Sequence, residues 1–394
     1  MPHDTSHDTP HGAHIYLDNA ASTAPSPRVC DEVLRVMREH YGNPSSLHAK
    51  GYEAEKLISG ARAEILRAMP ADGGRLVFTS GGTEANNMAI SGVCSKPPRT
   101  RANRVVTTGT EHPSVLNPIK EAGARGWQIS RCAVDAGGAI MPEELEALLD
   151  GDVALICFTH VNNETGAIQP LEQIAAIRGR KCPDALLHID CVQSFTKIPF
   201  NPGRLCMDFA SVSAHKIRGP KGVGALYMSA RARVSPLVFG GGQEAGLRSG
   251  TENTPAIAGF GLAASIASAD IALNAAHAEG LKSALIGALA ESGVKFERIP
   301  QEGRCSPYIL TLGFPGIPAE LMLNRLSMDG VYVSSGAACS SRRRGRTGSH
   351  VLTEMRVKQS LIDSAIRFSF SCANTLAEIE ASASAVKDAI AALS

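Results

Sequence analysis

Three short segments of this 394-residue chain carry residue types that could together hold a phosphorylated cofactor. Residues 78–87 form the pattern of a strand, a Gly-rich turn and a helix start, where backbone N–H groups and the Thr83 hydroxyl would bind an anion. A second apolar strand ends in Asp190, whose carboxylate could cap a helix, bind a metal or pair with a protonated ring nitrogen. Lys216 directly follows a third strand. Burial there would lower the pKa of its amine, as a Schiff-base lysine requires.

Each segment also has a purely structural explanation when it is taken alone. The Gly turn could be an ordinary helix start, Asp190 a helix cap and Lys216 a surface side chain with its ammonium in water. Together, however, an anion site, a carboxylate at a strand end and a desolvated amine are the groups that pyridoxal phosphate requires. The combination favours a pyridoxal phosphate enzyme over a metal or nicotinamide enzyme, because neither of those uses all three.

These residues need a sheet that brings several strand ends together. Between about residues 25 and 242, short apolar runs alternate with helical patterns, which is typical of a mostly parallel sheet with helices on both faces. Ligands bind at the carboxyl ends of the strands in such sheets. From about residue 254, an Ala-rich helix over 255–290, several strand-like segments and an amphipathic helix over 376–393 predict a smaller α+β domain. The expected strands are 76–78, 104–107, 153–158, 186–189, 209–212 and 223–227, then 308–312, 331–333 and 366–370.

The composition excludes several classes of protein. With 44% hydrophobic residues and a formal net charge of +1, neither disorder nor a general attraction to nucleic acid or membranes is expected. The ten cysteines are scattered and contain no CxxC pair, which indicates a reducing compartment such as the cytoplasm. No signal peptide is evident, and polar and charged residues interrupt the longest apolar region, so no membrane span is expected. Residues 1–14 are expected to be flexible.

Motifs that follow one another along nearly the whole chain identify a family. They occupy residues 16–21, 42–48, 79–87, 110–116, 161–166, 188–190, 213–216, 248–251 and 334–339. In these motifs the chain resembles the cysteine desulfurases of the NifS/IscS family, within the class V aminotransferase group of fold type I pyridoxal phosphate enzymes. The resemblance implies a large domain, residues 15–253, with a mostly parallel seven-stranded sheet flanked by helices. It also implies a smaller α+β C-terminal domain, residues 254–394, that carries the loop of the catalytic Cys339.

The resemblance implies a role for each matching residue. Lys216 would bind the cofactor covalently, Asp190 would pair with its pyridine nitrogen, and His112 would stack on its ring and assist proton transfer. Asn163 and Arg367 would bind the substrate carboxylate. The remaining cofactor-binding residues would be Gly82, Thr83, Asn163, Gln193, Ser213, His215 and, reaching across from the second subunit of a homodimer, Thr251.

Cys339 would be the nucleophile that accepts the sulfur. It follows a stretch of small residues, 334–338, and precedes four arginines within 342–346, which would favour the thiolate. The implied reaction takes sulfur from L-cysteine, leaves L-alanine and a persulfide on Cys339, and passes the sulfur to an acceptor such as an iron–sulfur scaffold protein. No resident metal is expected, although Cys339 could be a transient iron–sulfur ligand.

Two other classes of function stay open. A selenocysteine lyase or another class V enzyme of the aminotransferase type would need the same cofactor residues but not Cys339. A non-catalytic subunit would keep the fold alone. Two segments also depart from the family pattern: Ala337 replaces a Ser, and residues 370–375, Phe-Ser-Cys-Ala-Asn-Thr, replace a Gly-Arg-Phe-Thr-Thr sequence.

Overall fold

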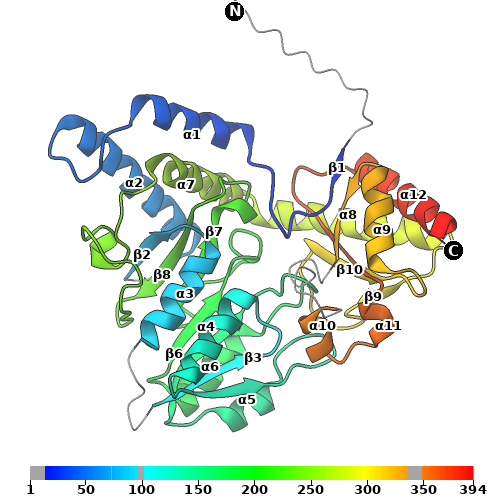
Figure 1. Cartoon of the computed structure of the whole chain (residues 1–394), viewed down its shortest axis with the longest axis horizontal. Helices are drawn as coiled ribbons and strands as arrows, with labels where there is room; N and C mark the ends of the chain where they lie inside the picture. Colours follow the sequence, from blue (N-terminus) through cyan, green and yellow to red (C-terminus); the bar gives the residue numbers. More distant parts are fainter. Residues whose placement is uncertain (1–13, 72, 96–101, 336–347, 394) are drawn as a thin grey trace, which may run out of the picture.

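A computed structural model describes residues 14–71, 73–95, 102–335 and 348–393 (Figure 1). The predictions for Cys339, for the arginines within 342–346 and for residues 1–13 therefore lie outside the described residues.

A seven-stranded sheet forms the centre of the larger part of the molecule. Its strands lie in the order β2-β8-β7-β6-β5-β3-β4, and β8 runs antiparallel to both of its neighbours while the other four pairings are parallel. The predicted mostly parallel sheet is thus confirmed. Its strands are β2 Gly74–Thr79, β3 Arg104–Thr108, β4 Gln128–Cys132, β5 Val153–Thr159, β6 Leu186–Asp190, β7 Phe209–Ser213 and β8 Gly224–Ser229.

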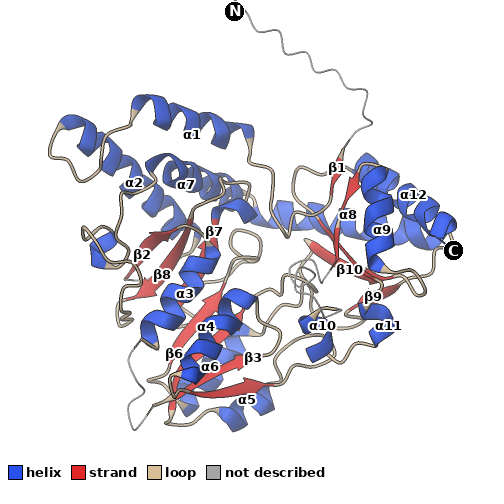
Figure 2. Cartoon of the chain, in the orientation of Figure 1, coloured by secondary structure: helices blue, strands red, loops and turns tan. Residues whose placement is uncertain are grey.

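Helices cover both faces of this sheet (Figure 2). The helices of this larger part are α1 Pro27–Glu39, which packs on α7, and α2 Ala49–Ala68, α3 Gly82–Val93, α4 Pro113–Ala124, α5 Pro142–Leu148, α6 Leu171–Lys181 and α7 Thr254–Ala269. The strands β5 to β8 are buried along almost their whole length, which explains their continuous apolar sequences. Strand β4 lies at the sheet edge with mostly exposed or half-exposed residues, so its polar sequence did not predict a strand.

The prediction of one helix over 255–290 is wrong. Two helices, α7 and α8 Ile271–Glu291, meet at Asp270 with a bend of 76°. The bend lets each helix bury its apolar residues in a different core: Phe260 of α7 packs under the large sheet, whereas Leu285 of α8 packs in the C-terminal part. Within the described part of the chain, no single helix is long and apolar enough to cross a membrane, and the bent pair α7 and α8 meets only the requirements of length and composition.

The C-terminal part contains a four-stranded antiparallel sheet in the order β12-β13-β10-β9. These strands are β9 Glu297–Ile299, β10 Ile309–Gly313, β12 Ser334–Ser335 and β13 Ala365–Ser369. The helices that accompany them are α8, α9 Ala319–Met328, α10 His350–Glu354, α11 Gln359–Ile362 and α12 Leu376–Leu393. The strand expected at 331–333 is interrupted: β11 Val331–Tyr332 and β12 belong to different sheets.

The N-terminal strand packs with the C-terminal part of the chain. Strand β1 Ile15–Tyr16 pairs in parallel with β11, and Figure 1 shows it beside the orange and red C-terminal elements. Ile15 and Leu17 join the apolar cluster of α8 and α12, while α7 joins the cluster of the large sheet. The start of the chain thus packs with the C-terminal part, and α7 packs with the large sheet. The division into domains 15–253 and 254–394 stays a proposal.

Phe260 tests whether α7 is part of the large core. Its ring is fully buried and lies edge-to-face against Phe195, with 6.2 Å between the ring centroids. Removing such a ring typically destabilises a protein by about 3–5 kcal/mol, so Phe260→Ala should lower the midpoint of thermal unfolding by several degrees. Leu273→Ala, at a 69% exposed position on α8, is the control and should leave the midpoint nearly unchanged. Equal midpoints for both variants would contradict this packing.

Candidate active site

A cavity of about 390 Å³ lies at the carboxyl ends of β5, β6 and β7. The N-terminal segment at Asp18 and the C-terminal residues Ser334, His350 and Arg367 close its other side. The cavity brings together most of the residues predicted from the sequence: Gly82, Thr83, His112, Asn163, Asp190, Gln193, Ser213, His215, Lys216 and Arg367. Thr251 does not line it and is exposed in the loop before α7.

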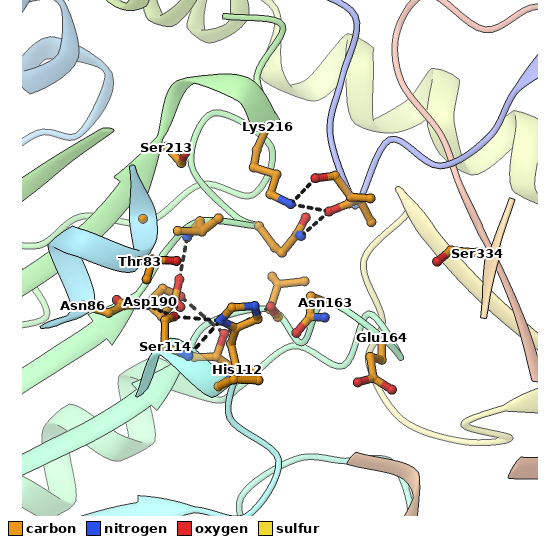
Figure 3. Close-up of a pocket in the computed structure, with 18 of the residues that line it drawn as sticks. Thr83, Asn86, His112, Ser114, Asn163, Glu164, Asp190, Ser213, Lys216 and Ser334 are labelled. Atoms are coloured by element: carbon orange, nitrogen blue, oxygen red, sulfur yellow. Dashed lines mark hydrogen bonds between the residues drawn. The ribbon is translucent and has the colours of Figure 1, made fainter. Parts of the chain in front are cut away.

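Lys216 lines this cavity rather than a flat outer surface (Figure 3). It ends a short 3-10 helix, Ala214–Lys216, that follows β7 directly, so the strand sets the direction of its side chain. The ammonium donates hydrogen bonds to the main-chain oxygens of Ala20, at 2.5 Å, and Ala21, at 2.8 Å. The N-terminal segment thus holds the amine on the cavity wall.

Asp190 is the last residue of β6 and is only 5% exposed. Its Oδ2 accepts a hydrogen bond from Asn86 Nδ2 at 2.7 Å, and its Oδ1 accepts one from the main-chain N–H of Val192 at 2.9 Å. The two donors fix the plane of the carboxylate and compensate for its burial. Asn86 was not assigned from the sequence, although it lies on the same face of α3 as Thr83, three residues earlier.

His112 is held with a defined tautomer at the N-terminus of α4. Its Nδ1 accepts a hydrogen bond from the main-chain N–H of Ser114 at 3.1 Å, and Ser114 Oγ lies 2.7 Å from the same nitrogen. Because Nδ1 must offer its lone pair to that N–H, the neutral ring carries its proton on Nε2. Burial lowers the pKa of His112; the charge of Asp190 opposes this shift, and that of Lys216 adds to it. The ring is therefore mostly neutral near pH 7.

The start of α3 and the end of β7 form a compact polar corner of the cavity. A Cβ atom on Gly82 would lie 2.5 Å from Val192 Cγ2, so only glycine allows this close approach. Ser213 Oγ is buried and has no hydrogen-bond partner among the described residues. The ring of His215 lies beside Ser22, with 3.2 Å between Nδ1 and Oγ, and burial together with nearby lysines lowers its pKa to about 4. Helix N–H groups and an unpartnered hydroxyl make this corner suitable for an anion.

Arg367 is more constrained than a free guanidinium. It lies on β13, where Nη2 forms an ion pair with Asp18 Oδ1 at 2.8 Å and Nη1 donates to the main-chain oxygen of Asn163 at 2.8 Å. Its Nε is buried without a partner in the described part of the chain. The sequence predicted the arginine but not Asp18, although Asp18 belongs to one of the motifs noted above.

The sequence did not indicate the two buried carboxyl groups of Glu111 and Glu164. Glu164 accepts a hydrogen bond from Ser349 Oγ, and burial raises its pKa despite that bond. The main-chain oxygen of Glu111 lies 2.9 Å from His350 Nε2. These contacts attach the start of α10 to the large part of the molecule. Both acids adjoin predicted residues in sequence, yet nothing in the sequence indicates their burial. Among the described residues, no group of three or more His, Cys, Asp or Glu side chains could hold a metal ion.

Glu111 makes the stability of the fold depend on pH. Burial raises its pKa from 4.5 to about 8; Thr108 Oγ1 donates to its Oε1 at 2.8 Å, while Oε2 has no partner in the described structure. Between these pH values the unfolded chain ionises this carboxyl while the folded chain keeps the proton, so stability is lost as pH rises. Glu111→Gln should therefore raise the midpoint of thermal unfolding by a few degrees at about pH 8 but much less at about pH 5.

The matched control for this prediction is Glu121→Gln, at an exposed position on α4. It should leave the unfolding midpoint unchanged at both pH values. A gain from Glu111→Gln that is the same at both would show that the carboxyl does not titrate in this range.

Comparisons with known proteins agree with this geometry. The family model of aminotransferase class-V matches residues 15–381. The putative cysteine desulfurase IscS 1 of Bacillus subtilis (strain 168) is 36% identical over 377 residues, which cover 95% of this chain and 98% of that protein. A solved NifS-like protein has a TM-score of 0.89 at 36% identity and covers 97% of this chain and 100% of its own. The structure of SspA in complex with cysteine has a TM-score of 0.78 at 29% identity, with coverages of 92% and 100%. The chain belongs to the aminotransferase class-V family and, within it, to the cysteine desulfurases of the IscS and NifS type.

Proposed function

We infer that this protein is a cysteine desulfurase, which removes the sulfur of L-cysteine, leaves L-alanine and holds the sulfur as a persulfide on Cys339. The observation that carries this inference is a single cavity lined by the amine of Lys216, the carboxylate of Asp190 and the guanidinium of Arg367. Its volume of about 390 Å³ suits a cofactor and a small substrate. The relatives named above support the same activity.

We propose pyridoxal phosphate as the cofactor, because the unpartnered groups of the cavity fit it. The Ser213 hydroxyl and the start of α3 at Gly82 and Thr83 would bind the phosphate. The Gln193 amide donates from Nε2 to the main-chain oxygen of Ala20, while its Oε1 is buried without a partner in the described structure, which leaves one end for a ring substituent. When bound, this cofactor supplies an electron-withdrawing ring that stabilises negative charge at the substrate Cα.

Asp190 and His112 would act on different parts of the cofactor. Asp190 would keep a proton on the pyridine nitrogen, since Asn86 and the Val192 N–H hold its carboxylate in place. Neutral His112, with its proton on Nε2, would pack against the ring and pass a proton to or from the substrate. Lys216 Nζ would hold the cofactor and would serve as the base for the proton at the substrate Cα.

Arg367 and Asn163 would bind the substrate carboxylate. The ion pair with Asp18 and the bond to the Asn163 main-chain oxygen orient the guanidinium before any substrate binds. Both Nη atoms of Arg367 are thus already engaged, and its buried Nε, which has no partner in the described structure, would donate to the ligand. In Figure 3 the side chain of Asn163 lies on the same side of the cavity as His112. The carboxylate would thus be fixed before the chemistry begins.

The role of Cys339 rests on chain connectivity, because the residue lies outside the described ranges. Ser335, where the preceding described range ends, lines the cavity, and so does His350 at the start of α10. Cys339 follows Ser335 by four residues in the sequence. We propose that its thiolate attacks the sulfur of the bound substrate, forming a sulfur–sulfur bond as the carbon–sulfur bond breaks. The electron pair of the broken bond stays on the substrate carbon, which takes up a proton to become the methyl group of L-alanine.

The partners remain part of the proposal. We propose a homodimer in which Thr251 of one subunit reaches the phosphate of the other. The ion pair between Arg248 and Glu84, at 2.9 Å, ties the loop before Thr251 to the start of α3. We further propose a sulfur acceptor protein such as an iron–sulfur scaffold and a cytoplasmic location, with no nucleic acid or membrane as partner.

Cys339→Ala tests the persulfide route. Alanine production from L-cysteine should fall by about a hundredfold or more, because the nucleophile is removed, while the absorbance of the bound cofactor stays the same. Cys30→Ala, an exposed cysteine on α1, is the control and should keep full activity. If Cys339→Ala protein released alanine and sulfide at the normal rate, a selenocysteine lyase or another class V reaction would be the better explanation.

Arg367→Lys tests the carboxylate site. The substitution keeps the charge but removes the planar fork, so KM for L-cysteine should rise by about tenfold or more. Cysteamine lacks the carboxylate, so its rate of turnover should be the same in the variant as in the normal enzyme. Arg325→Lys, in a solvent-accessible ion pair on α9, is the matched control and should change neither value. An equal loss with both thiols would assign Arg367 a structural role instead.

A further inference from the structure

A second cavity, of about 180 Å³, adjoins the active-site cavity at Lys216, which lines both. It lies where α7 bends into α8, between the large core and the end of β13. Ala263, Ile266 and Ala267 of α7 give it an apolar wall. None of the functions described so far uses this space.

Thr196 gives the second cavity an unsatisfied polar group. The residue is 5% exposed, and its hydroxyl is buried without a hydrogen-bond partner among the described residues. Its φ of +57° lies in the left-handed region, which β-branched residues rarely adopt. Arg218, also on the cavity wall, has a φ of +63°. Backbone strain of this kind concentrates at binding sites, where the surrounding fold maintains it.

Lys197 adds a positive group that lacks an anion. Its Nζ lies 5.5 Å from the centre of the Tyr308 ring and makes no hydrogen bond to any described residue. Burial lowers its pKa to about 7, the charge of Lys216 adds to this shift, and Cys372 opposes it. The guanidinium of Arg218 also faces Cys372, with Nη1 3.6 Å from Sγ. The described residues that line the cavity include three basic side chains, Lys197, Lys216 and Arg218, and one acidic side chain, Asp270. The wall is therefore mainly basic.

We propose that this second cavity binds a small monocarboxylate, with its oxygens on Lys197 and Thr196 and its carbon chain against α7. The size agrees with this class of ligand, since a cavity of about 150 Å³ holds a molecule of six carbon atoms such as benzene. Inorganic phosphate would leave the apolar wall without a partner. The proposal does not depend on the desulfurase reaction.

The test is calorimetric titration of the cofactor-loaded full-length protein with propionate, alanine and inorganic phosphate. Propionate should bind with a millimolar dissociation constant. Lys197→Met removes the charge, and Ala267→Leu fills the space while keeping every charge; each should weaken binding by about tenfold or more. Lys358→Met, at an exposed lysine before α11, is the matched control and should bind as the normal protein does.

Arg367→Gln separates this second cavity from the active site, where a carboxylate could also bind. Propionate binding should persist in that variant even if turnover is lost. Alanine, the proposed product, should bind the active site of the normal protein and lose that binding in Arg367→Gln, whereas propionate binding should not change. Propionate binding that is absent from the normal protein, or unchanged in Ala267→Leu, would overturn the proposal, as would binding of phosphate alone. If Lys197→Met fails to fold, Ala267→Leu decides.

Discussion

Most of the active site depends on keeping one carboxylate in place inside the protein. Asp190 is nearly inaccessible to water, and a buried charge is tolerated only where donors replace the lost hydration. One of its two donors is Asn86, which lies one turn into α3, and the same helix presents Gly82 and Thr83 to the cavity. The position of α3 therefore determines both the orientation of the Asp190 carboxylate and the place of the polar corner at Gly82 and Thr83. A shift of this helix along the sheet would disturb both ends of a bound cofactor at once.

The substrate side is built differently, from contacts between the two parts of the molecule. Arg367 comes from β13, but its partners are Asp18 and the main chain of Asn163, which come from the N-terminal segment and from the loop after β5. Ser349 and His350 add hydrogen bonds to Glu164 and Glu111. Because β1 pairs with β11, Asp18 is carried by the C-terminal part although it lies early in the sequence. The proposed substrate site is thus sensitive to how the two parts pack, whereas the proposed cofactor site depends mainly on the large sheet.

This difference explains how much the sequence could predict. The sequence could place Asp190 and Lys216 at one edge of the sheet, because Asp190 ends one apolar strand and Lys216 follows another, and parallel strands direct their carboxyl ends to one edge. The partners Asn86 and Asp18 could not be paired with their targets, since such pairs require knowledge of distances between remote segments. The sequence also did not predict the bend at Asp270, because an Ala-rich sequence favours a continuous helix. The bend follows from packing, since α7 and α8 bury their apolar residues in two different cores. The role expected for Thr251 is in the active site of a second subunit. The structure of a single chain does not test that role, so it stays a prediction.

Lys216 connects these arrangements, because it lies between two cavities of different character. The charge of its ammonium is one reason why Lys197 gives up its proton easily. Electrostatic coupling between two sites is reciprocal, so any change that removes the charge on Lys216 must strengthen proton binding at Lys197. A protonated Lys197 would attract an anion into the second cavity more strongly. The state of the active-site amine and the occupancy of the neighbouring space are therefore linked through a pair of lysines whose ammonium groups repel one another.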